Sequence, residues 1–262
     1  MLRPPIAAVL ALLLGACAAP TPLPPALVDG IGTTSRELLL LGEQHDAPQH
    51  RQLQRQVIEA LAAQDRLAAL ALEMAEQGQS TAGLPPDASE QSVRSALHWE
   101  EAGWQWPTYA AVVMAAVRAG APVLGANLPK AQMEAAMADI SLDHLLTGPA
   151  LKAQQQAIRI GHCGLLPESQ ITPMTRIQIA RDRSMARVLQ QAVVPGKTVV
   201  LIAGSRHVDP ALGIPQYLPP QLQAQAAPLP PQPPQKDYCE ELRSKMQRAV
   251  AAAPAARVKR TS

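Results

Sequence analysis

The chain has 262 residues, of which 47% are hydrophobic, and 23 basic against 21 acidic side chains leave a formal net charge of +2. This length provides enough apolar side chains for one core and makes a second full domain unexpected. The nearly balanced charge argues against a nucleic-acid partner, because proteins that bind nucleic acids need a basic face for the phosphates.

The first 17 residues are typical of a bacterial export signal. An arginine near the start precedes an apolar run that is too short to span a bilayer. The run ends in Leu14-Gly15-Ala16-Cys17, which resembles the lipobox of bacterial lipoproteins. The resemblance implies a signal peptide over residues 1–17 and a lipid on Cys17, which anchors a protein stably to a membrane. Because Ala18 stands where an aspartate would retain a lipoprotein at the inner membrane, we expect anchoring to the outer membrane, facing the periplasm.

Composition divides the rest of the chain into four segments. Residues 18–30 begin with a stretch rich in proline and alanine, and we expect them to form a tether. Residues 31–218 carry the apolar patterns of the globular domain. Residues 219–236 are rich in proline and are predicted to be extended and mobile. Residues 237–262 are predicted to form a helix that ends in a basic tail.

Four apolar runs of strand length alternate with segments of helical periodicity. Runs of this kind are typical of strands that are buried on both faces of a parallel sheet. We therefore predict a single α/β domain with a mainly parallel central sheet flanked by helices. Asp46 is predicted to cap the first helix, with Gln49 as its capping-box partner. In chain order we expect strands over 37–41, 67–72, 122–126 and 197–203, and helices after 46, near 89, and over 107–120, 129–140, 151–160, 175–192 and 238–252.

Two of the predicted strands end in the same pattern, a glycine followed three residues later by a histidine. The pairs are Gly42 with His45 and Gly204 with His207. Because parallel sheets bind their ligands just beyond the carboxyl ends of the strands, both histidines are expected at one site. The other candidates for this edge of the sheet are Glu43, Glu73, Arg181, His50, Asn127, His162, Arg206 and Tyr109.

Arg181 lies on the apolar stripe of its predicted helix, where an unpaired charge would be costly. It is expected either to pair with Glu43 or Glu73 at the edge of the sheet, or to extend outward into solvent.

These residue types leave three kinds of chemistry open. His45, Glu73 and His207 could hold a divalent metal ion for hydrolysis, with Glu43 as the base and Arg181 beside it. Histidine or tyrosine could instead bind haem iron, with arginine and histidine holding the propionates. A metal-free acid–base site of glutamate and histidine is the third. The chain has no glycine-rich phosphate loop, Cys-x-x-Cys pair or Gly-x-Ser-x-Gly elbow, which argues against nucleotide enzymes, redox dithiols and serine hydrolases.

The cysteines lead to a separate hypothesis, which concerns a disulfide. If Cys17 is lipidated, Cys163 and Cys239 remain, and an oxidising periplasm would allow them to form a disulfide that ties the C-terminal segment to the domain.

A set of motifs, in order from residue 38 to residue 218, resembles the ChaN-type haem-binding lipoproteins of the Tiki/TraB superfamily. The proline-rich segment and the helix that carries Cys239 go beyond the family pattern. The matching motifs are Gly42-Glu43-Gln44-His45-Asp46-Ala47-Pro48-Gln49-His50, Glu73, Trp106-Pro107-Thr108-Tyr109, Ala126-Asn127-Leu128-Pro129, His162-Cys163-Gly164, Gln178-Ile179-Ala180-Arg181-Asp182-Arg183-Ser184-Met185-Ala186 and Gly204-Ser205-Arg206-His207.

The resemblance implies an iron-regulated outer-membrane lipoprotein that binds haem, with two haems face to face in a homodimer. It also implies iron ligation by a tyrosine, a histidine supplied by the partner subunit, and an outer-membrane haem receptor as a further partner. Tyr109 is the candidate ligand, with Tyr217 and Tyr238 as the other tyrosines. The Tiki-like relatives, which are metal-dependent proteases, imply the alternative, a hydrolase that uses the same Gly-x-x-His and glutamate residues, and erythromycin esterases have a comparable arrangement of glutamate and histidine.

Overall fold

The computed structural model describes residues 23–25, 27, 31–32 and 36–252. The expected signal peptide, the lipidated Cys17 and the basic tail beyond residue 252 lie outside the described residues, as does most of the tether. Among the described residues, no helix is both long and apolar enough to cross a membrane.

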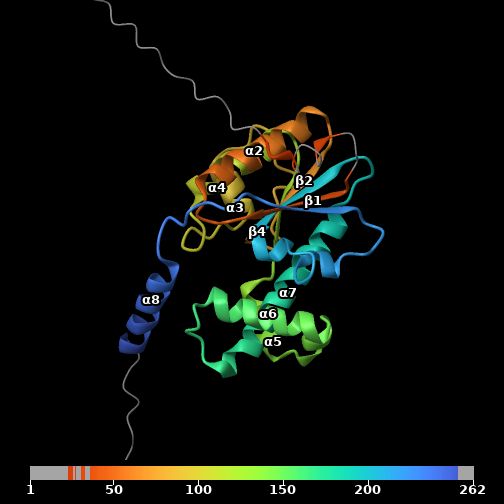
Figure 1. Cartoon of the computed structure of the whole chain (residues 1–262). Helices are drawn as coiled ribbons and strands as arrows, with labels where there is room; N and C mark the ends of the chain where they lie inside the picture. Colours follow the sequence, from red (N-terminus) through yellow and green to blue (C-terminus); the bar gives the residue numbers. More distant parts are fainter. Residues whose placement is uncertain (1–22, 26, 28–30, 33–35, 253–262) are drawn as a thin grey trace, which may run out of the picture.

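Five parallel strands form the central sheet, in the order β3-β2-β4-β1-β5. The prediction of an α/β domain with a mainly parallel sheet is therefore confirmed (Figure 1). The four consecutive leucines of residues 38–41 are fully buried, as expected for a strand that has helices on both faces. The strands are β1 (Leu38–Glu43), β2 (Leu67–Glu76), β3 (Val123–Asn127), β4 (Thr198–Gly204) and β5 (Ala224–Pro228).

Helices cover the two faces of this sheet unequally. Because successive strand side chains point to opposite faces, Leu39 and Leu41 pack in one cluster and Leu38 and Leu40 in the other. On one face lie α2 (Pro48–Ala63), α3 (Glu90–Ala96) and α4 (Trp106–Arg118). On the other lies α7 (Glu168–Ala192), with α5 (Met133–Ala138) and α6 (Gly148–Gly161) beyond it (Figure 1). Short 3-10 helices span Lys130–Gln132, Ile140–His144, Ser205–Val208 and Ile214–Tyr217.

The start of α2 differs from the prediction. Ala47 rather than Asp46 is the N-cap residue, and it has no side-chain cap. The carboxylate of Asp46 instead accepts hydrogen bonds from Gln44 Nε2 at 2.8 Å and from the backbone N–H of Gln235 at 2.7 Å. The predicted capping box is therefore wrong, because a distant segment of the chain competes for this carboxylate.

The predicted helix over 129–140 is also shorter than expected. The chain forms a 3-10 turn, the short helix α5, and a second 3-10 turn. Asp139 separates the last two, because its backbone is extended and its side chain accepts a hydrogen bond from Ser141 N at 3.0 Å.

The proline-rich segment supplies part of the sheet. Strand β5 pairs with β1 at the edge, where Pro228 is tolerated because an edge strand leaves one row of N–H groups unused. The sheet thus continues beyond residue 218, where the sequence placed the end of the domain. The segment is extended as predicted, and hydrogen bonds attach it to the body, as between Leu229 N and the Gly42 carbonyl at 2.8 Å, while its mobility stays a prediction. It leads into helix α8 (Tyr238–Ala252).

Candidate ligand site at the carboxyl edge of the sheet

The two Gly-x-x-His turns lie side by side, because Glu43 at the end of β1 is in register with Gly204 at the end of β4. Each glycine makes room for the other turn. A Cβ on Gly204 would lie 2.9 Å from His45 Nε2, and a Cβ on Gly42 would clash with Val208, directly after His207. The repeated glycines therefore allow the two turns to approach each other closely.

Glu43 is the centre of the first cluster of polar side chains. Its carboxylate is 1% exposed and receives hydrogen bonds from Tyr109 Oη at 2.8 Å and from Arg51 and Gln54. His45 Nδ1 lies 2.7 Å from Glu43 Oε1. Burial raises the pKa of Glu43, but the hydrogen bond with His45 and the charge of Arg51 outweigh it, so the pKa is lowered. Glu43 is therefore an ionised anchor that orients the His45 ring.

Glu73, from β2, is the centre of the second cluster. Arg181 Nη2 donates to Glu73 Oε1 at 2.5 Å, and the backbone N–H of Gly204 donates to Oε2 at 2.6 Å. Arg181 Nε also donates to Asn127 Oδ1 at 2.9 Å. Of the two partners predicted for Arg181, the structure selects Glu73. Burial raises the pKa of Glu73, but His207 and Arg181 hold it well below its usual range.

His207 is held between two carboxylates. Its Nδ1 lies 2.5 Å from Asp182 Oδ1, and its Nε2 lies 3.4 Å from Glu73 Oε1. Burial alone would lower the pKa of His207, but the charges of Glu73 and Asp182 raise it to about 9. The imidazole is therefore a buried cation that links Asp182 to Glu73, with its ring nitrogens already engaged.

We call Glu43, His45, Glu73, Arg181, Asp182 and His207 the edge network. Ion pairs and hydrogen bonds connect its members, and His45 is the one that combines a partner on Nδ1 with a side chain that is 40% exposed. His45 Nε2 lies 3.8 Å from Glu73 Oε2, and the ring meets Trp104 edge-on at 4.9 Å between centroids.

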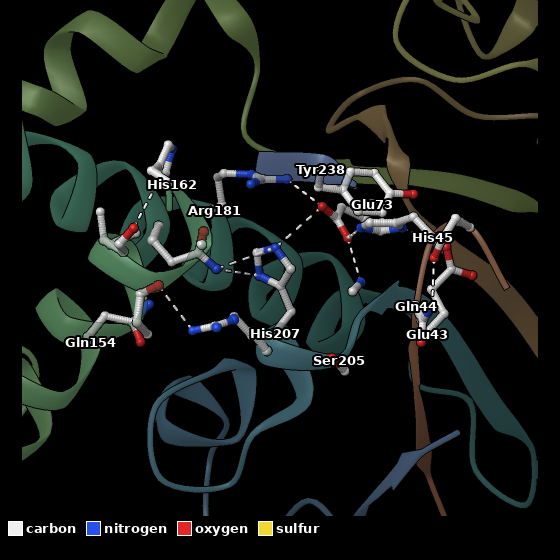
Figure 2. Close-up of a pocket in the computed structure, with 17 residues that line it drawn as sticks. Glu43, Gln44, His45, Glu73, Gln154, His162, Arg181, Ser205, His207 and Tyr238 are labelled. Atoms are coloured by element: carbon white, nitrogen blue, oxygen red, sulfur yellow. Dashed lines mark hydrogen bonds and ion pairs between the residues drawn. The ribbon is translucent and has the colours of Figure 1, made fainter. Parts of the chain in front are cut away.

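A cavity of about 550 Å³ opens above the edge network, between the sheet edge and helices α6 and α8 (Figure 2). The edge network forms one side of it. The rest of the lining includes Gln154, Ile158 and His162 from α6, and Tyr238 from α8, whose side chain is hydrogen-bonded with that of Asp46. We call the four residues from α6 and α8, with the adjoining cysteines 163 and 239, the α6–α8 wall.

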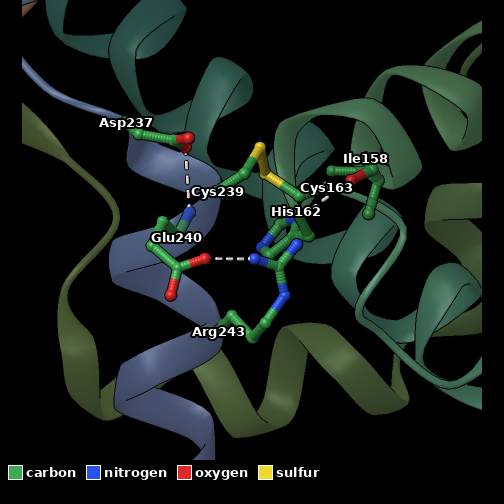
Figure 3. The surroundings of a disulfide bond; sticks show 7 residues. All are labelled: Ile158, His162, Cys163, Asp237, Cys239, Glu240 and Arg243. Atoms are coloured by element: carbon green, nitrogen blue, oxygen red, sulfur yellow. Dashed lines mark hydrogen bonds and ion pairs between the residues drawn. A yellow bond between two sulfur atoms is a disulfide. The ribbon is translucent and has the colours of Figure 1, made fainter.

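The cysteines of this wall are joined by a disulfide whose Cα atoms are 5.6 Å apart. Cys163 directly follows His162, and Cys239 directly follows Tyr238, so each cysteine adjoins a residue that lines the cavity (Figure 3). The pairing proposed from the sequence is present, and it brings the C-terminal helix to the cavity.

The structure brings most of the predicted site residues to this cavity. Asn127 contacts Glu73 and Arg181 from the end of β3 and lines a neighbouring hollow. Those that line the cavity itself are Glu43, His45, Glu73, His162, Arg181, Arg206 and His207.

Two predicted residues are placed elsewhere. Tyr109 is 2% exposed beneath Glu43, with Arg51 above its ring at 4.3 Å, and burial raises its pKa. His50 is 1% exposed, and its ring nitrogens contact Gln44 N at 3.0 Å and the Pro230 carbonyl at 2.8 Å. Neither lines the cavity, so both support the residues around it.

Sequence reasoning missed several functional side chains. Asp182 stands within a quoted motif but was given no role of its own, and Arg51 directly follows His50 without a signal of its own. Tyr238 was named only as one of the other tyrosines, and the predicted disulfide could have singled it out, because it places the neighbour of Cys239 near the neighbour of Cys163. Among the residues that the structure describes, no group of three or more His, Cys, Asp or Glu side chains is arranged to hold a metal ion. The metal site predicted from His45, Glu73 and His207 therefore gains no support.

Comparisons with known proteins agree with this arrangement. Residues 33–218 match the family described as haem-binding uptake, Tiki superfamily, ChaN. A solved structure described as cofacial heme binding to ChaN of Campylobacter jejuni is similar to this chain, with a TM-score of 0.59 and 25% sequence identity over 73% of this chain and 78% of that one. Among curated proteins, no sequence matches this chain.

Proposed function

Because the chain belongs to the haem-binding uptake, Tiki superfamily, ChaN family, we propose that it binds haem in the cavity between the edge network and the α6–α8 wall. The observation that carries this proposal is the cavity itself. Its volume of about 550 Å³ lies in the range of small-molecule and cofactor sites, and it exposes apolar surface between lining side chains that are mostly polar.

The cations around the cavity fit a ligand that carries carboxylates. Arg206 is exposed at the cavity and donates one hydrogen bond, from Nη1 to the Ala157 carbonyl at 3.1 Å. Its other donors suit a haem propionate, because guanidinium and carboxylate form strong charge-assisted hydrogen bonds. Arg181 also lines the cavity, but two of its donors are used by Glu73 and Asn127 and its side chain is only 21% exposed, so Arg206 is the better placed of the two.

The cavity wall also carries side chains of the kinds that bind haem iron, which are histidine and tyrosine. His162 Nδ1 lies 2.8 Å from the Ile158 carbonyl, which orients the ring. The phenol of Tyr238, from the first turn of α8, also lines the cavity. When bound, haem supplies iron and porphyrin chemistry, and the residues of this chain bind it, orient it and limit its contact with water.

The cellular role extends the proposal. With a lipid on Cys17, the protein would be anchored to the outer membrane on its periplasmic side and would take part in haem and iron acquisition, alongside an outer-membrane haem receptor. The lipobox supports the anchor. Metabolic labelling with a radioactive fatty acid, compared between wild type and Cys17→Ala, tests it: labelling of both proteins would contradict lipidation at this cysteine.

We also propose that two copies pair when haem is bound, with haems facing each other. Ile160, near the end of α6, is 58% exposed beside the cavity wall, which suits contact with a second copy. Light scattering should show a haem-dependent doubling of mass that Ile160→Asp abolishes. A monomer at saturating haem would contradict pairing without affecting the binding proposal.

One observation favours a second function, hydrolysis at the same edge. His45 is oriented by Glu43 at 2.7 Å and is partly open to the cavity, as a general base would be. Assays of aryl ester and peptide substrates, compared between wild type and His45→Ala, test this alternative. Turnover that is lost in the variant would support hydrolysis, whereas no turnover by wild type would remove it.

Titration of the full chain with haem, followed at the Soret band, tests the main proposal. We expect saturable binding at a fixed haem-to-chain ratio, and weaker binding by Arg206→Ala of about tenfold or less, because this exposed cation contacts a carboxylate. Arg55→Ala, which removes an exposed arginine from an ion pair with Glu59 on α2, is the matched control and should bind as wild type does. Absence of saturable binding by wild type would overturn the proposal.

A further inference from the structure

The segment between strand β5 and helix α8, residues 229–237, lies along the first Gly-x-x-His turn, and we call it the strap. Leu229 N donates to the Gly42 carbonyl at 2.8 Å, and the Pro230 carbonyl contacts His50 Nε2 at 2.8 Å. Farther on, Gln235 N donates to Asp46 at 2.7 Å. The strap therefore follows the turn that carries His45, from its first residue into the start of α2.

The strap ends directly before Tyr238, which lines the cavity. Tyr238 is the first residue of α8, its side chain is hydrogen-bonded with that of Asp46, and it is 44% exposed. Burial and the hydrogen bond with Asp46 raise its pKa to about 12. Lys236 lies over the ring at 5.0 Å. The phenol thus stays neutral in the absence of a ligand and borders the cavity from a segment outside the family-matched region of residues 33–218.

A disulfide holds the start of α8, at the C-terminal end of the strap, against α6. Cys239 joins α8 to Cys163 at the end of α6, across 76 residues of sequence. Cys163 has a φ of 57°, in the left-handed region that residues with a Cβ rarely adopt. The end of α6 is thereby turned so that Cys163 faces α8 while the preceding His162 lines the cavity (Figure 3).

The charged residues farther along α8 pair locally. Glu241 binds Lys236 and Lys245, and Arg243 binds Glu240. These pairs are exposed and contribute little to the position of the helix. The disulfide is the covalent link that holds the first turn of α8 against α6.

We propose that Tyr238 and His162 contact the bound haem as a pair, and that the Cys163–Cys239 disulfide is a positioning element that sets their spacing. This inference rests on the proposed haem binding and adds to it two contact residues and a dependence of affinity on the disulfide. Fixing both side chains before the ligand arrives lowers the entropy cost of binding, which is how preorganisation raises affinity.

The test compares haem titrations of the full chain, with the state of the disulfide verified by alkylation and mass measurement. The variants are Tyr238→Ala, His162→Ala and the pair Cys163→Ser/Cys239→Ser. Lys245→Ala, an exposed change on the same helix, is the matched control. The two alanine variants keep the disulfide, so they remain informative if the serine pair folds poorly.

We expect the control to bind as wild type does, and each alanine variant to bind haem about tenfold more weakly with a shifted Soret band. The serine pair should lose affinity to a similar extent while circular dichroism at the assay temperature still shows a folded protein. A merely structural disulfide would change thermal stability without moving the Soret band. Wild-type affinity and spectrum in the alanine variants, or in a folded serine pair, would overturn this proposal and leave haem binding intact. Failure of wild type to bind haem would overturn both.

Discussion

The two groups of residues that line the cavity, the edge network and the α6–α8 wall, are built in different ways. Apart from the partly exposed His45, the edge network consists of mainly buried side chains that pair with one another, such as Glu73 with Arg181 and His207. The α6–α8 wall presents partly exposed groups, such as Tyr238, that a disulfide and a strap hold in place. The comparison indicates that the edge network, most of which the sequence singled out, acts as the frame of the site, whereas the α6–α8 wall offers groups to a ligand.

The largest expected effect on stability comes from removing the Glu73 carboxylate from the edge network. Glu73→Ala would leave Arg181 and the His207 cation without their shared carboxylate, and losing one partner of a buried ion pair typically costs about 3–5 kcal/mol. Urea denaturation measures the change. Glu100→Ala, which removes an exposed partner of Lys130, is the control and should cost less than about 1 kcal/mol. Similar small losses in both variants would show that the edge network is not a stabilising frame.

The stability that the edge network contributes should also depend on pH, because His207 titrates. Because its pKa is raised to about 9 from the model-compound value of 6.5, its contribution is fully present below about pH 6.5 and is lost as the pH rises through 9. The contribution is on the order of 3 kcal/mol. Denaturation between pH 6 and 10 should show this loss in wild type, and His207→Gln should remove that part of the pH dependence. Parallel pH profiles in the two proteins would contradict a buried His207 cation.

A substitution at His50 tests the contact that attaches the strap to the first Gly-x-x-His turn. The side chain is buried and contacts both the first Gly-x-x-His turn and the Pro230 carbonyl, so His50→Ala should cost about 2–4 kcal/mol. Amide exchange should increase in residues 229–237. His144→Ala, at an exposed position, should change neither quantity. Unchanged exchange in the strap of the His50 variant would mean that this contact does not hold it.

A smaller effect is expected at Tyr109. Tyr109→Phe removes the hydroxyl that donates to Glu43 at 2.8 Å and should cost about 1–2 kcal/mol while leaving the haem spectrum unchanged. Tyr217→Phe is the matched control. Among the described atoms the Tyr217 hydroxyl has no hydrogen-bond partner, so its loss should be close to neutral. A shifted Soret band in Tyr109→Phe would restore Tyr109 as the candidate iron ligand.

The residues of the edge network were easier to predict from the sequence than those of the α6–α8 wall. Runs such as residues 38–41 and 199–203 are apolar throughout, so the central strands and the residues at their ends could be located from the pattern. Strand β5 could not, because Ala-Gln-Ala-Ala-Pro at the edge of a sheet needs no apolar alternation. The proline content of the strap is typical of a mobile linker. Its attachment could not be predicted, because its contacts join residues about 180 positions apart, such as His50 and Pro230.

Asp182 shows the same limit within a helix. An aspartate beside an arginine usually reads as a solvated pair, and only the packing of α7 against His207 shows that it is fully buried. Contacts that depend on tertiary packing of this kind have no local signature.

The most direct measurement asks whether haem enters this cavity. Gly161 lines the cavity and Gly148 begins the same helix, and a Cβ at either position would meet open space, so both positions accept a side chain. Haem titrations of Gly161→Trp and Gly148→Trp should differ sharply, with the indole at 161 filling the cavity and abolishing saturable binding, and the variant at 148 binding as wild type does. Wild-type affinity in a folded Gly161→Trp protein would contradict the account, because haem would then bind elsewhere on the molecule.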